Sequence, residues 1–315
     1  MDGGSGTGIS STPIYNYFVQ CSKKVSPNYL SFIIPSRWFA GGKGLDEFRR
    51  DMLNDKRISK IYDFMSSKDC FNNADIAGGV NFFLWDKSHD DLCEINNCDK
   101  NGIISSSTRA LNEFNILIRD NRAISIIRKF IQSGDENLAD HTYTRNPFGF
   151  VSKERGHNKP VYNTDNIVLI SSGGKGYVQR SDITKSIDAI DRYKVIIGKV
   201  VPGNGEVDVN PKDGYRVTTS SRILNPGEIH TESYLMLHDF ETYEEAKNFA
   251  DYMKLKFPRF MMKHTLSSMN ISTQNFAFVP FLDYKKKWSD EELFEKYNLT
   301  EEEKLYVQNY IREMQ

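Results

Sequence analysis

A segment near the amino terminus, residues 29–50, carries three successive signals that constrain the fold. It begins with an uninterrupted apolar run, 30–34, which is long enough for a buried strand. A proline ends this run, and a glycine-rich loop that carries Arg37 and Lys43 follows. After the loop, apolar residues recur at the spacing of a helix. A buried strand that leads through a glycine-rich loop into a helix is typical of an α/β sheet.

The alternation of helix and strand continues downstream of this segment. A helix is expected over 13–28 and another over 45–57, strands are expected over 58–64 and 79–86, and the runs 92–95 and 102–106 flank the turn-rich sequence Asn-Asn-Cys-Asp-Lys-Asn-Gly. Residues 1–12 are rich in Gly, Ser and Thr and are typical of a flexible arm. Alternation followed by a hairpin predicts the second half of an α/β sheet.

The pattern changes after a helix over 121–132 that Asp120 can cap, and the polar stretch 133–141 marks a boundary. Short β-like runs follow at 167–170, 193–201 and 233–237, and one helix opens with the capping box Thr242/Glu245 and is expected to end at Pro258. Two more capping boxes, Ser289/Glu292 and Thr300/Glu303, predict helices in the tail. We therefore predict domains at 1–135 and 136–282, with a helical tail at 283–315.

Composition limits the classes of function. With 39% hydrophobic and 12% aromatic residues the 315-residue chain can build real cores, and its net charge of -1 excludes a uniformly basic nucleic-acid binder. No apolar run reaches the length of a membrane span, and the amino terminus lacks the features of a signal peptide. The spacing of the four cysteines fits no zinc site, so we expect free thiols, no metal and a cytoplasmic location.

Any contact with DNA must therefore come from local basic surface. Residues 137–222 hold 13 Lys and Arg against nine Asp and Glu. The candidates for DNA contact in this region are Arg145, Arg155, Lys159, Lys175, Arg180 and Arg222. Arg37 and Lys43 are further candidates, because basic glycine-rich turns can approach a phosphate backbone closely. Neither their loop nor the second glycine-rich loop, residues 173–176, has the pattern of a P-loop. An ordinary solvated surface is the alternative interpretation.

Residues 29–50, with Phe71 and Gly78-Gly79 downstream, resemble the adenine-specific DNA methyltransferases of bacterial type II, IIG-like restriction-modification systems. The segment 249–260 resembles the helix that ends the target recognition domain of such enzymes, and 278–281 and 288–293 resemble their carboxyl-terminal region. The resemblance covers nearly the whole chain. It implies a partial Rossmann-like methyltransferase sheet, then a mixed α+β target recognition domain, then a helical tail.

The resemblance also assigns a role to Phe71. A base that is methylated within a duplex must first be flipped out of the stack, and it then needs a flat apolar face. In the resembled family an aromatic residue just before this strand stacks on the flipped adenine, and Phe71 occupies the matching place. The alternative from the residues alone is that Phe71 is a core residue at the edge of a strand.

The family's catalytic tetrapeptide, Asn-Pro-Pro followed by an aromatic residue, does not occur in the sequence. Asn146-Pro147-Phe148 lacks the second proline, and we interpret it as a turn. The S-adenosylmethionine site of the family precedes that tetrapeptide. The chain alone is therefore expected neither to bind the donor well nor to methylate, and a longer enzyme or a partner chain would supply the front half. The absence of that half would expose apolar sheet edge and face.

The leading hypothesis is the carboxyl-terminal portion of an adenine-N6 DNA methyltransferase that binds double-stranded DNA and, when complete, uses S-adenosylmethionine. The alternative is a non-catalytic, sequence-specific DNA-binding specificity subunit of a restriction-modification complex. An RNA-modifying or purely structural protein is a third interpretation.

Overall fold

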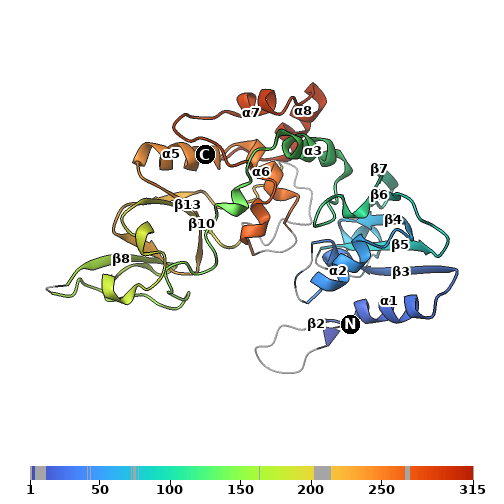
Figure 1. Cartoon of the computed structure of the whole chain (residues 1–315), viewed down its shortest axis with the longest axis horizontal. Helices are drawn as coiled ribbons and strands as arrows, with labels where there is room; N and C mark the ends of the chain where they lie inside the picture. Colours follow the sequence, from blue (N-terminus) through green and yellow to red (C-terminus); the bar gives the residue numbers. More distant parts are fainter. Residues whose placement is uncertain are drawn as a thin grey trace. The chain divides into compact units, whose positions relative to one another are not determined.

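The computed structural model of the chain describes residues 2–3, 12–40, 42, 44–71, 73, 76, 78–162, 164–201, 214–266 and 270–314, with only the backbone given for 2–3 and 12. The fold is mixed α/β, as the sequence predicts. It divides into two compact units: unit 1 spans Met1–Ser125, and unit 2 begins at Ile126 (Figure 1). Within the described ranges, every helix is too short or too polar to cross a membrane.

Unit 1 is built around a five-stranded sheet. Its elements are β1 (Asp2–Gly3), β2 (Thr12–Pro13), α1 (Tyr15–Lys24), β3 (Tyr29–Pro35), α2 (Asp46–Leu53), β4 (Ile58–Phe64), β5 (Val80–Asp86), β6 (Cys93–Asp99) and β7 (Gly102–Arg109). The strand order is β3-β5-β4-β6-β7; β4 and β6 run parallel, and the other neighbours are antiparallel. The expected strands are confirmed. Strands β1 and β2 pair with each other where a flexible arm was expected.

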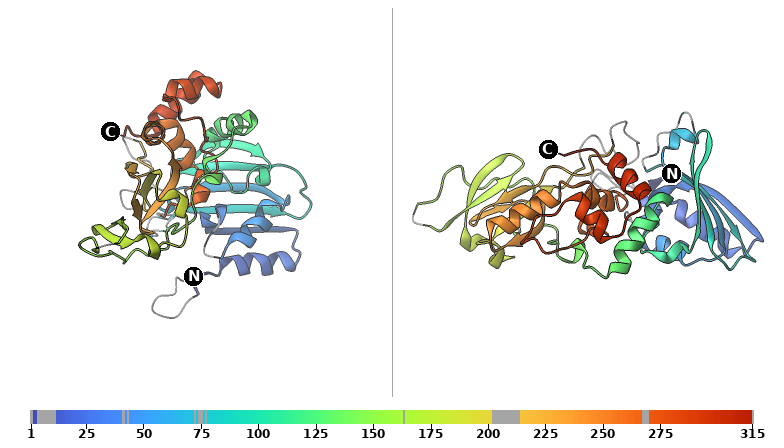
Figure 2. Two further views of the ribbon diagram at one scale, coloured as in Figure 1. Left: turned by 60° about the vertical axis from the view of Figure 1, so that its left-hand side comes forward. Right: turned by 90° about the horizontal axis from the view of Figure 1, so that it is seen from above.

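The core of unit 1 lies on one face of this sheet. Alternate residues of β3, which include Leu30, Phe32 and Ile34, belong to one hydrophobic cluster with side chains of α1 and α2. Figure 2 shows both helices on the same side of the sheet. Val19 of α1 and Met52 of α2 are fully buried there, which explains the helical spacing of apolar residues in both segments.

The opposite face of the sheet is also apolar but belongs to no core cluster. Tyr29 and Ile33 of β3 are 66% and 53% exposed. Beside them the rings of Tyr62 and Phe82 stack with their centroids 4.6 Å apart. Strand β3 is an edge strand of the described sheet. Unit 1 thus shows the exposed apolar edge and face that the sequence predicts.

The described part of unit 2 contains two three-stranded sheets and five α-helices. Its elements are α3 (Ile124–Ser133, which begins in unit 1), β8 (Asn166–Ser171), β9 (Gly174–Gln179), β10 (Tyr193–Gly198), β11 (Arg222–Leu224), β12 (Glu228–His230), β13 (Tyr234–Phe240), α5 (Tyr243–Tyr252), α6 (Lys256–Lys263), α7 (Asp290–Lys296) and α8 (Glu301–Tyr310). The strand orders are β11-β10-β13 and β12-β8-β9. Apolar residues of both sheets share one core cluster.

Helix α3 packs with the tail. Asp120 accepts a hydrogen bond from the Arg122 backbone N–H, as the sequence predicts, and Phe130 contacts the ring of Tyr297 with centroids 6.0 Å apart. Lys129 pairs with Glu303 of α8 at 2.5 Å. These contacts place the division of the chain before the boundary predicted after residue 135, and the tail 283–315 belongs to unit 2. The functional domains stay a prediction.

The expectation that Pro258 ends a helix was wrong. The helix that Thr242 caps ends at Tyr252, and Pro258 is the third residue of the next helix, α6. The first backbone N–H groups of a helix have no partner within it, so proline costs little there. The carboxylate of Asp290, from α7, accepts hydrogen bonds from the N–H groups of Lys256 and Phe257 at 2.9 and 2.8 Å.

The turn predicted between the hairpin strands was too long. Strand β6 continues through Asn96 and Asn97 to Asp99. Both asparagine side chains are buried and satisfied: Asn97 donates to the Arg119 carbonyl oxygen at 2.6 Å, and Asn96 accepts from Ser106 at 2.5 Å. Tertiary hydrogen bonds have overridden the local turn preference of these residues.

Candidate functional site

The candidate site lies where the parallel strands β4 and β6 of unit 1 end. In sheets with parallel strands, ligands bind outside the carboxyl ends of those strands. Phe64 ends β4, and the loop that follows carries Phe71 before the chain returns as β5. The end of β3, with the 3₁₀ turn Ser36–Phe39 that carries Arg37, reaches the same edge, because Pro35 pairs with the first residue of β5.

A buried carboxylate joins these segments. Asp63, near the end of β4, is only 1% exposed. It accepts a hydrogen bond from the Ser36 hydroxyl at 2.8 Å and a bidentate pair from Arg119, with both N–O distances 2.8 Å. Asn81 of β5 donates to the Ser36 oxygen at 3.2 Å. A buried ion pair is stable only when its hydrogen bonds are well aligned and fully made. This cluster therefore fixes the ends of β3, β4 and β5 relative to one another.

Arg119 extends the cluster to the loop that carries Phe71. Its guanidinium also donates to the carbonyl oxygens of Gly78 at 2.8 Å and Phe64 at 3.3 Å. Gly79, the next residue, has φ +71°, and a Cβ there would lie 2.1 Å from the Phe64 carbonyl oxygen. Only glycine permits so close an approach. The loop is therefore held against the end of β4.

Phe71 follows a single 3₁₀ turn, Ser67–Asp69, in this loop. Its backbone N–H donates to the Ser67 carbonyl at 2.7 Å, and the Ser67 hydroxyl accepts from the N–H of Ile76 at 2.8 Å. The side chain is 38% exposed and belongs to no core cluster. An exposed ring on a braced loop is chemically suited to stacking on a planar group.

The candidate cations of unit 1 are Arg37 and Lys43. Arg37 lies between the buried Ser36 and Trp38 and is itself half-buried. Its charge acts on Tyr15: burial raises the pKa of Tyr15 well above its usual value, and the positive charge of Arg37 opposes that rise. Lys43 lies outside the described residues.

Several candidate cations of unit 2 are engaged within the fold. Arg180 forms ion pairs with Asp165 at 2.7 Å and Asp191 at 2.6 Å. Arg145 pairs with Glu232 at 3.0 Å, and Lys175 pairs with Glu228 at 3.3 Å. Arg180, held by two carboxylates, is thus a bridge between loops, whereas Arg145 and Lys175 are mostly exposed and each pairs with one carboxylate.

The remaining candidates of unit 2 are exposed. Arg155 donates to the carbonyl oxygens of Ser152 and Glu154 at 2.5 and 2.9 Å. The side chains of Lys159 and Arg222 form no hydrogen bond or ion pair with any other described residue. Their DNA contacts stay predictions.

The segment Asn146-Pro147-Phe148 forms a turn. Asn146 has φ +59°, and Phe148 is 1% exposed in the core of unit 2. The ring that follows the proline is therefore interior. All four cysteines are free thiols, and the described part of the chain holds no group of three or more His, Cys, Asp or Glu side chains placed to bind a metal.

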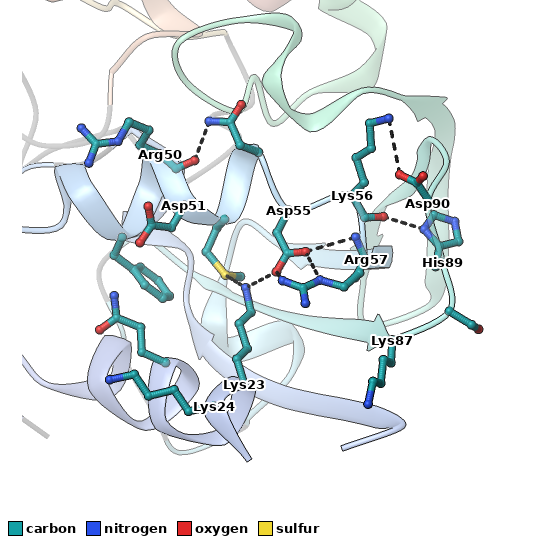
Figure 3. A pocket seen from close by; sticks show the side chains of 15 residues that line it. Lys23, Lys24, Arg50, Asp51, Asp55, Lys56, Arg57, Lys87, His89 and Asp90 are labelled. Atoms are coloured by element: carbon teal, nitrogen blue, oxygen red, sulfur yellow. Dashed lines mark hydrogen bonds and ion pairs between the residues drawn. The ribbon is translucent and has the colours of Figure 1, made fainter. Parts of the chain in front are cut away.

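A pocket of about 990 Å³ lies at the opposite edge of the unit 1 sheet (Figure 3). At its floor Asp55 pairs with Lys23 at 2.8 Å and with Arg57 at 2.7 Å, and accepts from the Trp85 ring N–H at 2.9 Å. Burial lowers the pKa of Lys23, which its hydrogen bond to Asp55 opposes. These charges satisfy one another, and the pocket lies away from the candidate site.

The residues that build the site do not stand out in the sequence. Ser36, Asp63, Asn81 and Arg119 were not singled out. An acidic residue between two aromatic residues near the end of a strand, such as residue 63 in 58–64, is a signal that a cation must pair with it, because carboxylates are rarely buried alone. The sequence does not indicate that Arg119, 56 residues away, is that partner.

Comparison with known proteins finds a family match at the amino-terminal part of the chain. The family described as Eco57I restriction-modification methylase matches residues 2–71, which include Ser36, Asp63 and Phe71. An uncharacterized adenine-specific methylase of Mycoplasma pneumoniae is 34% identical over 98 residues, which cover 30% of this chain and 23% of that relative. The chain thus matches less than a quarter of that relative's length.

Among solved structures, the type IIG restriction endonuclease BpuSI aligns with 90% of this chain and 47% of its own, at 11% identity and a TM-score of 0.31. This TM-score is too low to define a shared fold. Residues 2–71 of the chain are therefore similar in sequence to the Eco57I restriction-modification methylase family.

Proposed function

We propose that this chain supplies the adenine-stacking surface and the DNA-recognition part of an adenine-N6 DNA methyltransferase of the restriction-modification type. The observation that carries the proposal is the exposed ring of Phe71, on a loop braced by Arg119 and Asp63, within the stretch that matches the methylase family. Phe71 stacks on a flipped adenine, Arg37 contacts the nearby DNA backbone, and unit 2 recognises the sequence of the duplex.

The residues described at this edge do not fit the methyl donor. Donor and dinucleotide sites commonly use a carboxylate at a strand end to bind ribose hydroxyls. Here Asp63 is 1% exposed and its two oxygens already accept from Ser36 and Arg119. We therefore assign S-adenosylmethionine to polypeptide other than this chain, and derive no step through it. Transfer of labelled methyl groups to DNA by the isolated chain would contradict this assignment.

The stacking role is tested by duplexes whose adenine is already unpaired. Proteins that flip a base pay less to extrude one that faces an abasic site. We expect the full chain to prefer a duplex with such an adenine, and Phe71→Ala to reduce that preference about tenfold, because base–aromatic stacking contributes roughly 1–3 kcal/mol. Phe71→Trp keeps a flat ring and retains the preference. Fluorescence anisotropy with labelled duplexes measures all three.

The matched control is Phe18→Ala, which removes an aromatic ring that is 54% exposed on α1. It leaves the preference unchanged. Equal preference in Phe71→Ala and the wild type would exclude the stacking role. Sequence-dependent binding by a wild-type chain that shows no preference for the unpaired adenine would instead favour a DNA-binding specificity subunit without a catalytic part.

A further inference from the structure

One segment of unit 2 presents cations that the fold does not use. This segment, residues 151–162, is called the basic strap here. Each residue from 151 to 160 is exposed, and the sequence places Lys153, Arg155, His157 and Lys159 at alternate positions. Lys153 and Lys159 have no hydrogen-bond or ion-pair partner in the part of unit 2 that the structure describes. Tyr162, at the end of the strap, is 88% exposed.

The acidic residue of the strap makes a hydrogen bond within the strap itself. The Glu154 carboxylate accepts a hydrogen bond from the Val151 backbone N–H, and the Glu154 N–H donates to the Val151 carbonyl at 3.0 Å. Glu154 therefore closes a local turn. Its carboxylate makes this local hydrogen bond and forms no ion pair with Lys153 or Lys159 within the described residues.

The strap is nevertheless ordered, because it pairs with the free edge of β9. His157 and Tyr177 exchange two backbone hydrogen bonds, of 2.7 and 2.9 Å. A Cβ at Gly176 would lie 1.7 Å from the Arg155 carbonyl oxygen, so only glycine lets the strap lie this close. The Arg155 guanidinium reaches Ser172, in the β8–β9 turn, at 3.4 Å. Arg155 is thus a positioning residue.

We propose that the basic strap and the β8–β9 turn form the part of unit 2 that enters a groove of duplex DNA, with Lys153 and Lys159 on phosphates. This inference rests on the proposed function. The major groove of DNA admits a two-stranded β-ribbon, and the turn between β8 and β9 carries Gly173 and Gly174, which allow close approach. A preordered cationic segment loses little entropy on binding.

The salt dependence of binding by the full chain tests this inference. Each phosphate contact adds about 0.9 to the slope of log affinity against log salt. The double variant Lys153→Ala/Lys159→Ala is expected to reduce that slope by about 1.8 over roughly 0.05–0.2 M salt, and to weaken binding about tenfold. Anisotropy with a pool of random duplexes measures both. The matched control, Lys285→Ala/Lys287→Ala, removes the same charge from exposed positions of the tail and keeps the wild-type slope.

A second variant keeps every charge but disturbs the strap. Gly176→Ala is expected to speed hydrogen exchange of the His157 and Tyr177 amides and to weaken DNA binding. Faster exchange with unchanged binding would overturn the inference, as would a wild-type salt slope in the lysine double variant. Either result leaves DNA binding itself intact. Failure of the wild-type chain to bind any duplex would instead contradict the proposed function.

Discussion

The two edges of the unit 1 sheet use the same chemical unit, a buried aspartate that binds an arginine through two hydrogen bonds, in different ways. At one edge Asp63 pairs with Arg119, which is 56 residues away in the sequence. At the other edge Asp55 pairs with Arg57, two residues away. The exposed fraction of the arginine side chain is 23% in the first pair and 48% in the second.

The proposed site is therefore not the one that pocket size alone would select. The 990 Å³ pocket lies at the edge of Asp55, where paired charges join α1, α2 and β5. The edge of Asp63 has the long-range pair, the constrained Gly79 and the exposed Phe71. A pair that fixes distant segments is what a preorganised site requires.

The largest effect is expected at Asp63. Asp63→Asn removes the charge that compensates Arg119, and breaking a buried ion pair on one side destabilises by about 3–5 kcal/mol. Urea unfolding measures the change in a Trp288→Phe background, in which the remaining tryptophans, Trp38 and Trp85, both report on unit 1. The apolar pair Asp63→Leu/Arg119→Met is expected to recover most of the loss. A loss of stability under about 1 kcal/mol for Asp63→Asn would show that the Asp63 pair stabilises the fold no more than an exposed pair does.

A smaller loss is expected at Gly79. Gly79→Ala imposes both an unfavourable positive φ and the contact with the Phe64 carbonyl, so we expect about 2–3 kcal/mol of destabilisation. Gly78→Ala is the control, since Gly78 has φ +87° but open space around its position. It is expected to cost about 1 kcal/mol less in the same urea experiment. Equal costs would show that the approach to Phe64 is not tight.

Local patterns predicted the elements well, while the site depended on contacts that no local pattern contains. The helix caps Thr242, Ser289 and Thr300 were all identified from spacing, because a capping box lies within four residues. The Asp63–Arg119 pair spans separate elements, so it could not be derived in this way.

Errors in the sequence analysis have the same cause. Pro258 lies within α6 because Asp290, from another helix, caps that helix. In α8, Leu305 is 56% exposed, since the tail packs through Val307 and Ile311 instead. The periodicity of apolar residues predicts that a helix forms, but tertiary contacts determine which face of the helix is buried.

At the second edge the prediction concerns pH. Burial raises the pKa of Asp55, but hydrogen bonds from Arg57, Lys23 and Trp85 outweigh it and hold the pKa at about 2. Because the folded-state pKa is lowered from 3.8, the stabilisation is present above pH 3.8 and is lost as pH falls toward 2. We expect unit 1 to lose about 1–2 kcal/mol over that window. Asp55→Asn should flatten the loss when urea unfolding is repeated across it.

The smallest effect is expected at Arg57, which tests the comparison most directly. Arg57 is half exposed, pairs locally with Asp55, and lies 4.7 Å from the Trp85 ring centre. Exposed pairs contribute about 1 kcal/mol or less, and salt screens them. Arg57→Ala should therefore cost under about 1 kcal/mol, with the cost shrinking at high salt, whereas Arg119→Ala should cost several-fold more and depend little on salt. If the two variants lost equal stability, sequence separation and burial would not distinguish the edges, and the Asp63 cluster would no longer mark the functional one.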